Sequence, residues 1–216
     1  NISLTTLAAG AWLAGAVLLL LWQVGRYFLA RRGVLKRSRP VKGLENYARE
    51  ICPGRQVRFY ACPGLPGPMT MGLFRPVVLL PEEGAAPAAL RHELYHIRRW
   101  DVAYKVLMLA ACCLHWFNPL VWWMARAADR DVEACCDAAV VAHRDTAYKR
   151  AYGELLLTAA VGKTAPFATH FGGGKEQMRS RLTQLFRPGK RSRGLVCGLL
   201  AAAVMLSGLV ACREKG

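Results

Sequence analysis

Acidic residues are scarce in this sequence: 14 Asp and Glu stand against 30 Lys and Arg, which gives a net charge of +16 and a pI of about 10. Hydrophobic residues nevertheless make up 54% of the chain. A basic excess alone would suit a nucleic-acid-binding protein. Combined with this apolar content, it favours a membrane protein with basic cytoplasmic segments. We therefore expect the lipid bilayer as a partner and no direct contact with nucleic acid.

Several familiar site motifs are also missing. The eight cysteines include no C-x-x-C pair, which excludes a zinc knuckle, and in a cytoplasmic segment we expect them to be reduced and buried. The glycine-rich segment 167–174 is not followed by the Gly-Lys-Ser/Thr of a phosphate loop. No internal repeat is present, so a solenoid architecture is excluded.

Charge is absent from two long stretches, residues 1–25 and 194–212. Each is long enough to cross a bilayer core of about 30 Å as a helix. The first lacks the basic n-region of a signal peptide, and its Trp residues suit a membrane interface. We predict a transmembrane helix and its flank at 1–29 and a second transmembrane helix at 194–212. Because the chain begins at Asn1, we expect a fragment of a longer protein, with 213–216 starting an external part.

Lys and Arg follow the first stretch and precede the second, so residues 30–193 are predicted to be one cytoplasmic domain. A third uncharged stretch, Val106–Ala125, complicates this topology. Crossing the membrane there would export either residues 26–105, with 15 Lys and Arg, or residues 126–193, with 13. It would also place His92 and His96 on the opposite side of the bilayer from Glu133. We interpret it as a buried or interfacial helix–turn–helix broken at Asn118-Pro119.

The central motif is His92-Glu93-Leu94-Tyr95-His96, an H-E-x-x-H pattern. On a helix, positions i and i+4 share a face, so His92 and His96 can hold one metal ion. Glu93 is placed to act as a general base toward a water molecule at that metal. This pattern predicts a Zn²⁺ site, with Glu93 as the catalytic residue.

A third ligand is available downstream. Catalytic zinc needs three protein ligands and an open position. If the segment around Glu133 is helical, Asp129, Glu133 and Asp137 lie on one stripe. We predict Glu133 as the third metal ligand, and Asp137 as the group that accepts the free N–H of a ligating histidine. The five candidates for a second donor to the oxyanion are Tyr95, His115, Asn118, Tyr148 and Tyr152, and the sequence does not choose among them.

The predicted fold is mainly α with a small β-sheet, two transmembrane helices flanking the cytoplasmic domain. Short strands are expected where β-forming residues alternate between turns, and helices where apolar residues recur at helical spacing. The expected strands are Val57–Ala61, Met69–Phe74 and Val77–Pro81, and the expected helices are Leu44–Cys52, Pro87–Ala111, Ala127–Ala142, Tyr148–Val161 and Lys175–Phe186. A strand edge beside the zinc helix could bind an extended peptide.

Four sequence blocks in this order resemble one known family. They are Met69–Pro81, His92–Asp101, His115–Trp122 and Glu133–Asp137. The chain is similar to the integral-membrane zinc metallopeptidase domain of the BlaR/MecR antirepressor family, the bacterial β-lactam sensor-transducers. This resemblance implies a gluzincin-type site in a multi-pass protein of the bacterial plasma membrane. It also implies cleavage of a cytoplasmic winged-helix repressor, of the chain itself, or of both, in response to an external signal.

The family's antibiotic sensor is not in this chain, which contains no Ser-x-x-Lys acylation motif. A β-lactam trigger is therefore not predicted, and a homodimer is compatible with the sequence. Two alternatives remain open: a quality-control or maturation zinc protease of the membrane, and a non-catalytic signalling module in which zinc holds helices together. Retained zinc without cleavage would favour the module.

Overall fold

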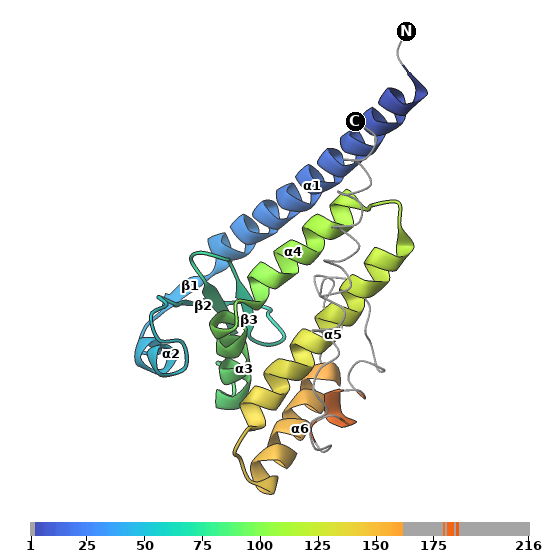
Figure 1. Ribbon diagram of the computed structural model, residues 1–216. Coiled ribbons are helices and arrows are strands. Elements are labelled where there is room, and N and C mark those ends of the chain that lie inside the picture. Colours follow the sequence, from blue (N-terminus) through green and yellow to red (C-terminus); the bar gives the residue numbers. More distant parts are fainter. Residues whose placement is uncertain (1–2, 162–178, 180, 184, 186–216) are drawn as a thin grey trace.

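The computed structural model describes residues 3–161, 179, 181–183 and 185. The protein is mainly helical and has one small mixed sheet (Figure 1). The helices are α1 (Leu4–Arg37), α2 (Glu45–Ile51), α3 (Pro87–Arg98), α4 (Asp101–Leu114), α5 (Pro119–Val141) and α6 (Thr146–Val161), and the strands are β1 (Arg39–Val41), β2 (Arg58–Cys62), β3 (Met69–Met71) and β4 (Val77–Pro81).

Helix α1 is 34 residues long and extends well beyond the rest of the structure. Ser3 caps its N-terminus by accepting a hydrogen bond from the Thr6 amide at 3.2 Å. Among the described residues, α1 is the one helix long and apolar enough to cross a membrane. This agrees with the first predicted span, whereas the second, at 194–212, lies outside the described residues.

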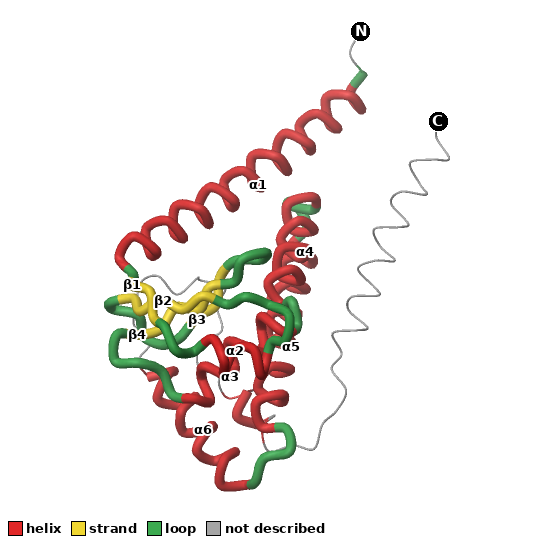
Figure 2. The backbone as a smooth tube through the Cα atoms, turned by 90° about the vertical axis from the view of Figure 1, so that its left-hand side faces the viewer, coloured by secondary structure: helices red, strands yellow, loops and turns green. Residues whose placement is uncertain are grey.

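The sheet has the strand order β1-β2-β4-β3 (Figure 2). Strands β2 and β4 are parallel, while β1 and β3 pair antiparallel to their neighbours. Val77 to Leu80 are all buried, as expected for a continuous apolar run in a central strand. β1 was not predicted, because Arg39-Pro40 belongs to a basic segment that we interpreted only as a topology determinant. It pairs along the β2 edge, where a proline is tolerated.

One face of the sheet packs on α2 and α3. Their shared core contains Ala48, Ile51, Cys52, Val57, Phe59, Val78, Leu80, Leu90, Leu94 and Ile97. Pro87 occupies the first turn of α3, where its missing N–H costs nothing. The opposite face of α3, which carries His92 and His96, therefore faces α5.

The prediction of one helix from Pro87 to Ala111 was wrong. Trp100 adopts a left-handed conformation (φ 60°, ψ 32°) that ends α3 and begins α4. Arg55 supports this turn by donating to the Ile97 carbonyl at 2.9 Å and by lying over the Trp100 ring at 3.8 Å. These two contacts, made by a residue 42 positions upstream of Ile97, offset the strain of a positive φ at a bulky residue.

Helices α4 and α5 form an antiparallel hairpin, as the break predicted at Asn118-Pro119 requires. Asn118 caps α5 by accepting from the Leu120 amide at 3.0 Å, and Pro119 follows at the first helical position. Because α4 and α5 return to the same end, the uncharged stretch does not separate the two halves of the chain. The far end of α5 packs with α6 and with Leu185 in a second core.

Candidate metal centre

Helix α3 brings His92 and His96 together. Both side chains are buried, their rings stand edge to face with centroids 4.7 Å apart, and their Nε2 atoms are 3.0 Å apart. This arrangement follows from the one-turn spacing of positions i and i+4.

Helix α5 packs beside α3 and supplies Glu133 (Figure 1). Its Oε2 lies 3.4 Å from His92 Nε2, and its Oε1 lies 3.5 Å from His96 Nε2. A carboxylate oxygen of Glu93 lies within 4.8 Å of a ring nitrogen of each histidine. The structure thus brings the three predicted ligands and the predicted base to one point.

Side chains of α5 and α6 contact His92 on its Nδ1 side, away from Glu133. Its Nδ1 lies 3.1 Å from Asp137 Oδ1 and 3.0 Å from the Tyr152 hydroxyl, which donates to the same carboxylate at 2.7 Å. Arg181 donates from Nε and Nη2 to the two oxygens of Asp137, each at 2.7 Å. Asp137 therefore stands where the sequence placed it, while the sequence did not assign Arg181 any part in the site.

A different set of side chains, from Asp101, Cys136 and Arg99, surrounds Nδ1 of His96. Its Nδ1 lies 2.8 Å from Asp101 Oδ2, and the Cys136 thiol donates to that oxygen at 3.1 Å. Arg99 Nε lies 3.5 Å from the other oxygen of Asp101. No part in the site was predicted for Asp101. In an unbroken helix, Asp101 would point away from His96, so only the turn at Trp100 allows this contact.

The donor set fits a divalent cation. Because both Nδ1 atoms face carboxylates, the protons belong on Nδ1 and each Nε2 presents a lone pair. Two such lone pairs 3.0 Å apart, with a carboxylate at 3.4 and 3.5 Å, repel one another, and either a metal ion between them or a proton on one Nε2 removes this repulsion. Two imidazoles and one carboxylate are a ligand set typical of catalytic zinc.

Electrostatics support the same assignment. Burial opposes the charge of His92, but hydrogen bonds to Asp137 and Glu133 outweigh it and raise the pKa of His92 to about 9. Burial likewise opposes ionisation of Glu133, yet His92 and His96 hold its pKa well below the usual range. For Asp137, the Arg181 hydrogen bonds overcome burial and lower the pKa to about 2. The pocket is built to keep its carboxylates ionised around a positive charge.

A second cluster of ligand types, His96, Asp101 and Cys136, also lies within 4.8 Å. Its three side chains are buried and hydrogen-bonded to one another, which leaves no open coordination position. Burial, together with Asp101, raises the pKa of Cys136 far above its usual value. The thiol therefore stays a hydrogen-bond donor, and we assign this cluster to orienting His96.

The five candidates for an oxyanion donor lie in different places. Tyr152 is bonded behind His92, and His115 and Asn118 lie at the turn between α4 and α5. The Tyr95 hydroxyl accepts from Arg91, and the Tyr148 ring lies beneath Arg144. Lys105 on α4 was not among these five candidates. Its ammonium lies 3.6 Å from Glu133 Oε1 and its side chain is partly exposed.

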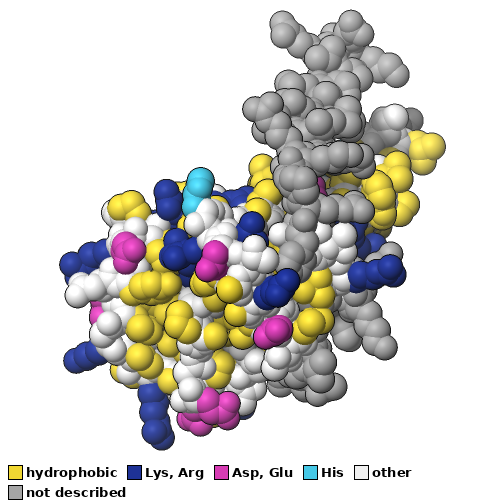
Figure 3. All heavy atoms as spheres, turned by 90° about the horizontal axis from the view of Figure 1, so that it is seen from below, with side chains coloured by type: hydrophobic (Ala, Val, Ile, Leu, Met, Phe, Trp, Pro, Cys, Tyr) yellow, Lys and Arg dark blue, Asp and Glu magenta, His cyan; other side chains and the backbone are white. Residues whose placement is uncertain are grey.

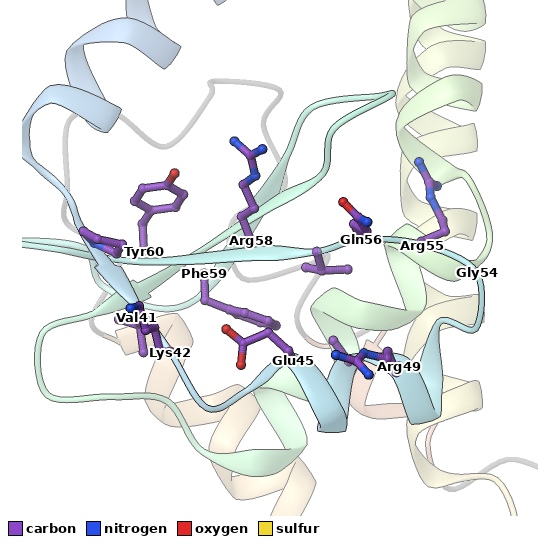
Figure 4. A pocket seen from close by; sticks show the side chains of 13 residues that line it. Val41, Lys42, Glu45, Arg49, Gly54, Arg55, Gln56, Arg58, Phe59 and Tyr60 are labelled. Atoms are coloured by element: carbon purple, nitrogen blue, oxygen red, sulfur yellow. The ribbon is translucent and has the colours of Figure 1, made fainter.

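A hollow of about 650 Å³ contains none of the predicted site residues. It is lined by β1, β2 and α2, with Arg58 and Tyr60 pointing away from Phe59 across the strand (Figure 4). The metal centre is therefore separate from this hollow.

Comparison with known proteins gives a consistent result. The family model described as BlaR1 peptidase M56 matches residues 3–185. The chain is 35% identical over 101 residues to the regulatory protein BlaR1 of Bacillus licheniformis, covering 44% of this chain and 17% of the relative. It is 23% identical over 167 residues to the methicillin resistance mecR1 protein of Staphylococcus aureus, covering 71% and 28%. The chain thus spans less than a third of the length of these relatives.

Proposed function

The chain belongs to the BlaR1 peptidase M56 family, and on that premise we propose that it is a membrane-anchored zinc endopeptidase of a signalling system. The observation that carries this proposal is the convergence of His92 Nε2, His96 Nε2 and the Glu133 carboxylate, with Glu93 alongside. The site has the composition of a gluzincin centre on an H-E-x-x-H helix.

His92, His96 and Glu133 would hold the metal. When bound, zinc would act as a Lewis acid, polarising a peptide carbonyl and making a water molecule more acidic near neutral pH. The remaining groups prepare the ligands for that task. Asp137 and Asp101 keep the histidine protons on Nδ1, so that both Nε2 atoms remain free to bind.

Glu93 is the proposed general base. It follows His92 on α3, and its backbone carbonyl accepts from Thr70 Oγ1 of β3 at 3.2 Å, which ties the helix to the sheet at this residue. Glu93 would accept the proton of the attacking water and deliver it to the leaving amine. Lys105, 3.6 Å from Glu133, is the cation whose position favours a role beside the developing oxyanion.

The proposed substrate is an extended peptide segment. β3 lies at the edge of the sheet, and the Thr70 hydrogen bond joins it directly to the H-E-x-x-H helix. An edge strand offers main-chain donors and acceptors to a peptide that pairs with it. The names of the relatives, a regulatory protein and a methicillin resistance protein, point to regulation and antibiotic resistance. We propose a cytoplasmic transcriptional repressor, or the chain itself, as the protein cleaved.

The test uses full-length protein purified in detergent and a purified candidate repressor. Wild-type protein with zinc is expected to cut the repressor or itself, as detected by mass spectrometry. Glu93→Gln should keep one zinc and lose at least about 100-fold in cleavage rate, because only the proton acceptor is removed. Substantial cleavage by Glu93→Gln would refute the assigned base. Zinc binding without any cleavage by wild type would favour the non-catalytic signalling module.

A further inference from the structure

The α4–α5 hairpin exposes many large apolar side chains within the described part of the chain. Residues 106–125 carry no formal charge, and Phe117 and Leu120 are 61% and 67% exposed. The large exposed side chains on the hairpin are Val106, Leu107, Leu114, Trp116, Phe117, Leu120 and Trp123. A patch of this kind on a protein marks an interaction surface.

The tip of the hairpin is fixed to the middle of the apolar part of α1. Trp12 Nε1 donates to the Leu114 carbonyl at 2.7 Å, and Trp116 Nε1 donates to the Trp12 carbonyl at 3.3 Å. Gly15 makes room for this contact, since a Cβ there would come within 2.8 Å of the Trp116 ring. Small residues allow such close approach between helices inside membranes.

The turn at the tip meets the main demand of a lipid environment, which is that backbone groups find partners inside the protein. The carbonyl of Leu114 accepts from Trp12, the carbonyl of His115 accepts from the Asn118 amide at 2.8 Å, and the carbonyl of Trp116 accepts from Trp122 Nε1 at 3.1 Å. Two of these three donors are indole side chains. A turn facing water would not need them.

Position along α1 gives the depth of the tip. The uncharged part of α1 from Leu4 to Gly25 is about 33 Å long at about 1.5 Å per residue, close to the bilayer core of about 30 Å. Trp12 and Gly15 lie near its centre. Contact with them would therefore place the hairpin tip near the middle of the bilayer.

We propose that the α4–α5 hairpin is a re-entrant element that inserts its tip into the acyl-chain layer beside α1 and returns to the cytoplasmic side. This inference rests on the proposed membrane anchoring through α1. The occupant of the apolar surface is lipid, because the hairpin shares the depth of α1 and carries no charge until Arg126. The face seen in Figure 3, opposite the N-terminus, carries Lys, Arg, Asp and Glu side chains among its hydrophobic ones, whereas residues 106–125 of the hairpin carry no formal charge.

The insertion also fixes the height of the metal centre. Asp101 and Glu133 each lie about 14 residues from the tip along their helices, which is about 21 Å at most. Half of the bilayer core is about 15 Å. The centre is thereby held at the level of the lipid headgroups. Its substrates are peptide segments that can reach the membrane surface.

The test measures the depth of single side chains in full-length protein reconstituted in phosphatidylcholine/phosphatidylglycerol vesicles. A spin-labelled p-acetylphenylalanine replaces Phe117, Trp123 or Arg130 in turn, which leaves the native cysteines untouched. Collision with oxygen, which concentrates in the bilayer, is compared with collision with a water-soluble nickel chelate. The same label at Leu18 on α1 provides the bilayer reference. The label at Phe74, 84% exposed between β3 and β4, provides the aqueous one.

The expected oxygen-to-nickel ratio at position 117 equals that at 18, exceeds that at 74 several-fold, and falls steadily through 123 to 130. An aqueous ratio at 117 with a bilayer ratio at 18 would overturn the hairpin insertion alone. Shielding of 117 from both reagents would also overturn it, because protein rather than lipid would cover the tip. An aqueous ratio at 18 would overturn the membrane anchoring itself, and the insertion with it.

Discussion

Each ring of the histidine pair is oriented by its own buried carboxylate, and the two carboxylates have different supports. Asp137 behind His92 is neutralised by the guanidinium of Arg181, whereas Asp101 behind His96 is held by the Cys136 thiol and Arg99. Metal ligands that are fixed in this way lose less freedom on binding, which raises metal affinity.

Asp101 provides a direct test of that role. We expect Asp101→Ala to weaken zinc binding by about 10- to 100-fold, because His96 loses the group that fixes its proton and its ring orientation. Competition with a chromophoric chelator measures the affinity. Asp129→Ala is the matched control, since Asp129 pairs with Lys105 at 2.9 Å and does not touch either histidine. Equal zinc affinity in both variants would contradict the assignment.

The pKa of His92 predicts how the metal-free protein responds to pH. A folded-state pKa of about 9 against an unfolded value near 6.5 stabilises the fold below pH about 6.5, and this stabilisation is lost as the pH rises through 9. The lowered pKa values of Glu133 and Asp137 act oppositely and stabilise the fold above about pH 4.

We therefore expect the melting temperature of chelator-treated protein in detergent to fall by several degrees between pH 6 and pH 9. In His92→Asn this fall should largely disappear, because the titrating ring is gone. Zinc should reverse the trend, since the metal requires neutral His92 and binds better as the pH rises. A melting temperature that climbs from pH 6 to 9 without metal would contradict the assigned network.

At the scale of elements, the turn at Trp100 is where sequence reasoning fails most instructively. The stretch from Pro87 to Ala111 has helical periodicity and contains no glycine or further proline to announce a break. The break depends on Arg55, which reaches the Ile97 carbonyl and the Trp100 ring from a distant loop. Local propensity cannot register such a contact, so Asp101, which needs the turn to reach His96, was missed with it.

The packing of α1 on the hairpin tip yields a further prediction. Gly15→Leu should lower the melting temperature in detergent by several degrees, because its side chain would collide with the rigid Trp116 ring. Gly10→Leu is the control on the same helix, since a Cβ at Gly10 meets nothing within 4 Å. If the two variants have the same melting temperature, the contact between α1 and the hairpin is not as described.

At the scale of the whole molecule, the parts that the sequence predicts are those with a regular period. The i, i+4 pair His92/His96, the stripe of Glu133 and Asp137, and the apolar strand Val77–Pro81 all follow from helical or strand spacing. The contacts of Arg181 and Cys136 do not, because each joins segments more than 30 residues apart, as the separations of 44 from Asp137 and 35 from Asp101 show. Such contacts depend on how helices pack, and no spacing rule encodes them.

The central claim is that the two Nε2 atoms and Glu133 hold zinc, while the neighbouring cluster with Cys136 only orients His96. Zinc K-edge X-ray absorption on the full-length protein in detergent distinguishes the two directly. We predict one zinc per chain, with nitrogen and oxygen ligands at about 2.0–2.2 Å and two imidazoles in the outer-shell scattering. A sulfur ligand at about 2.3 Å would move the metal to Cys136 and contradict the proposed centre.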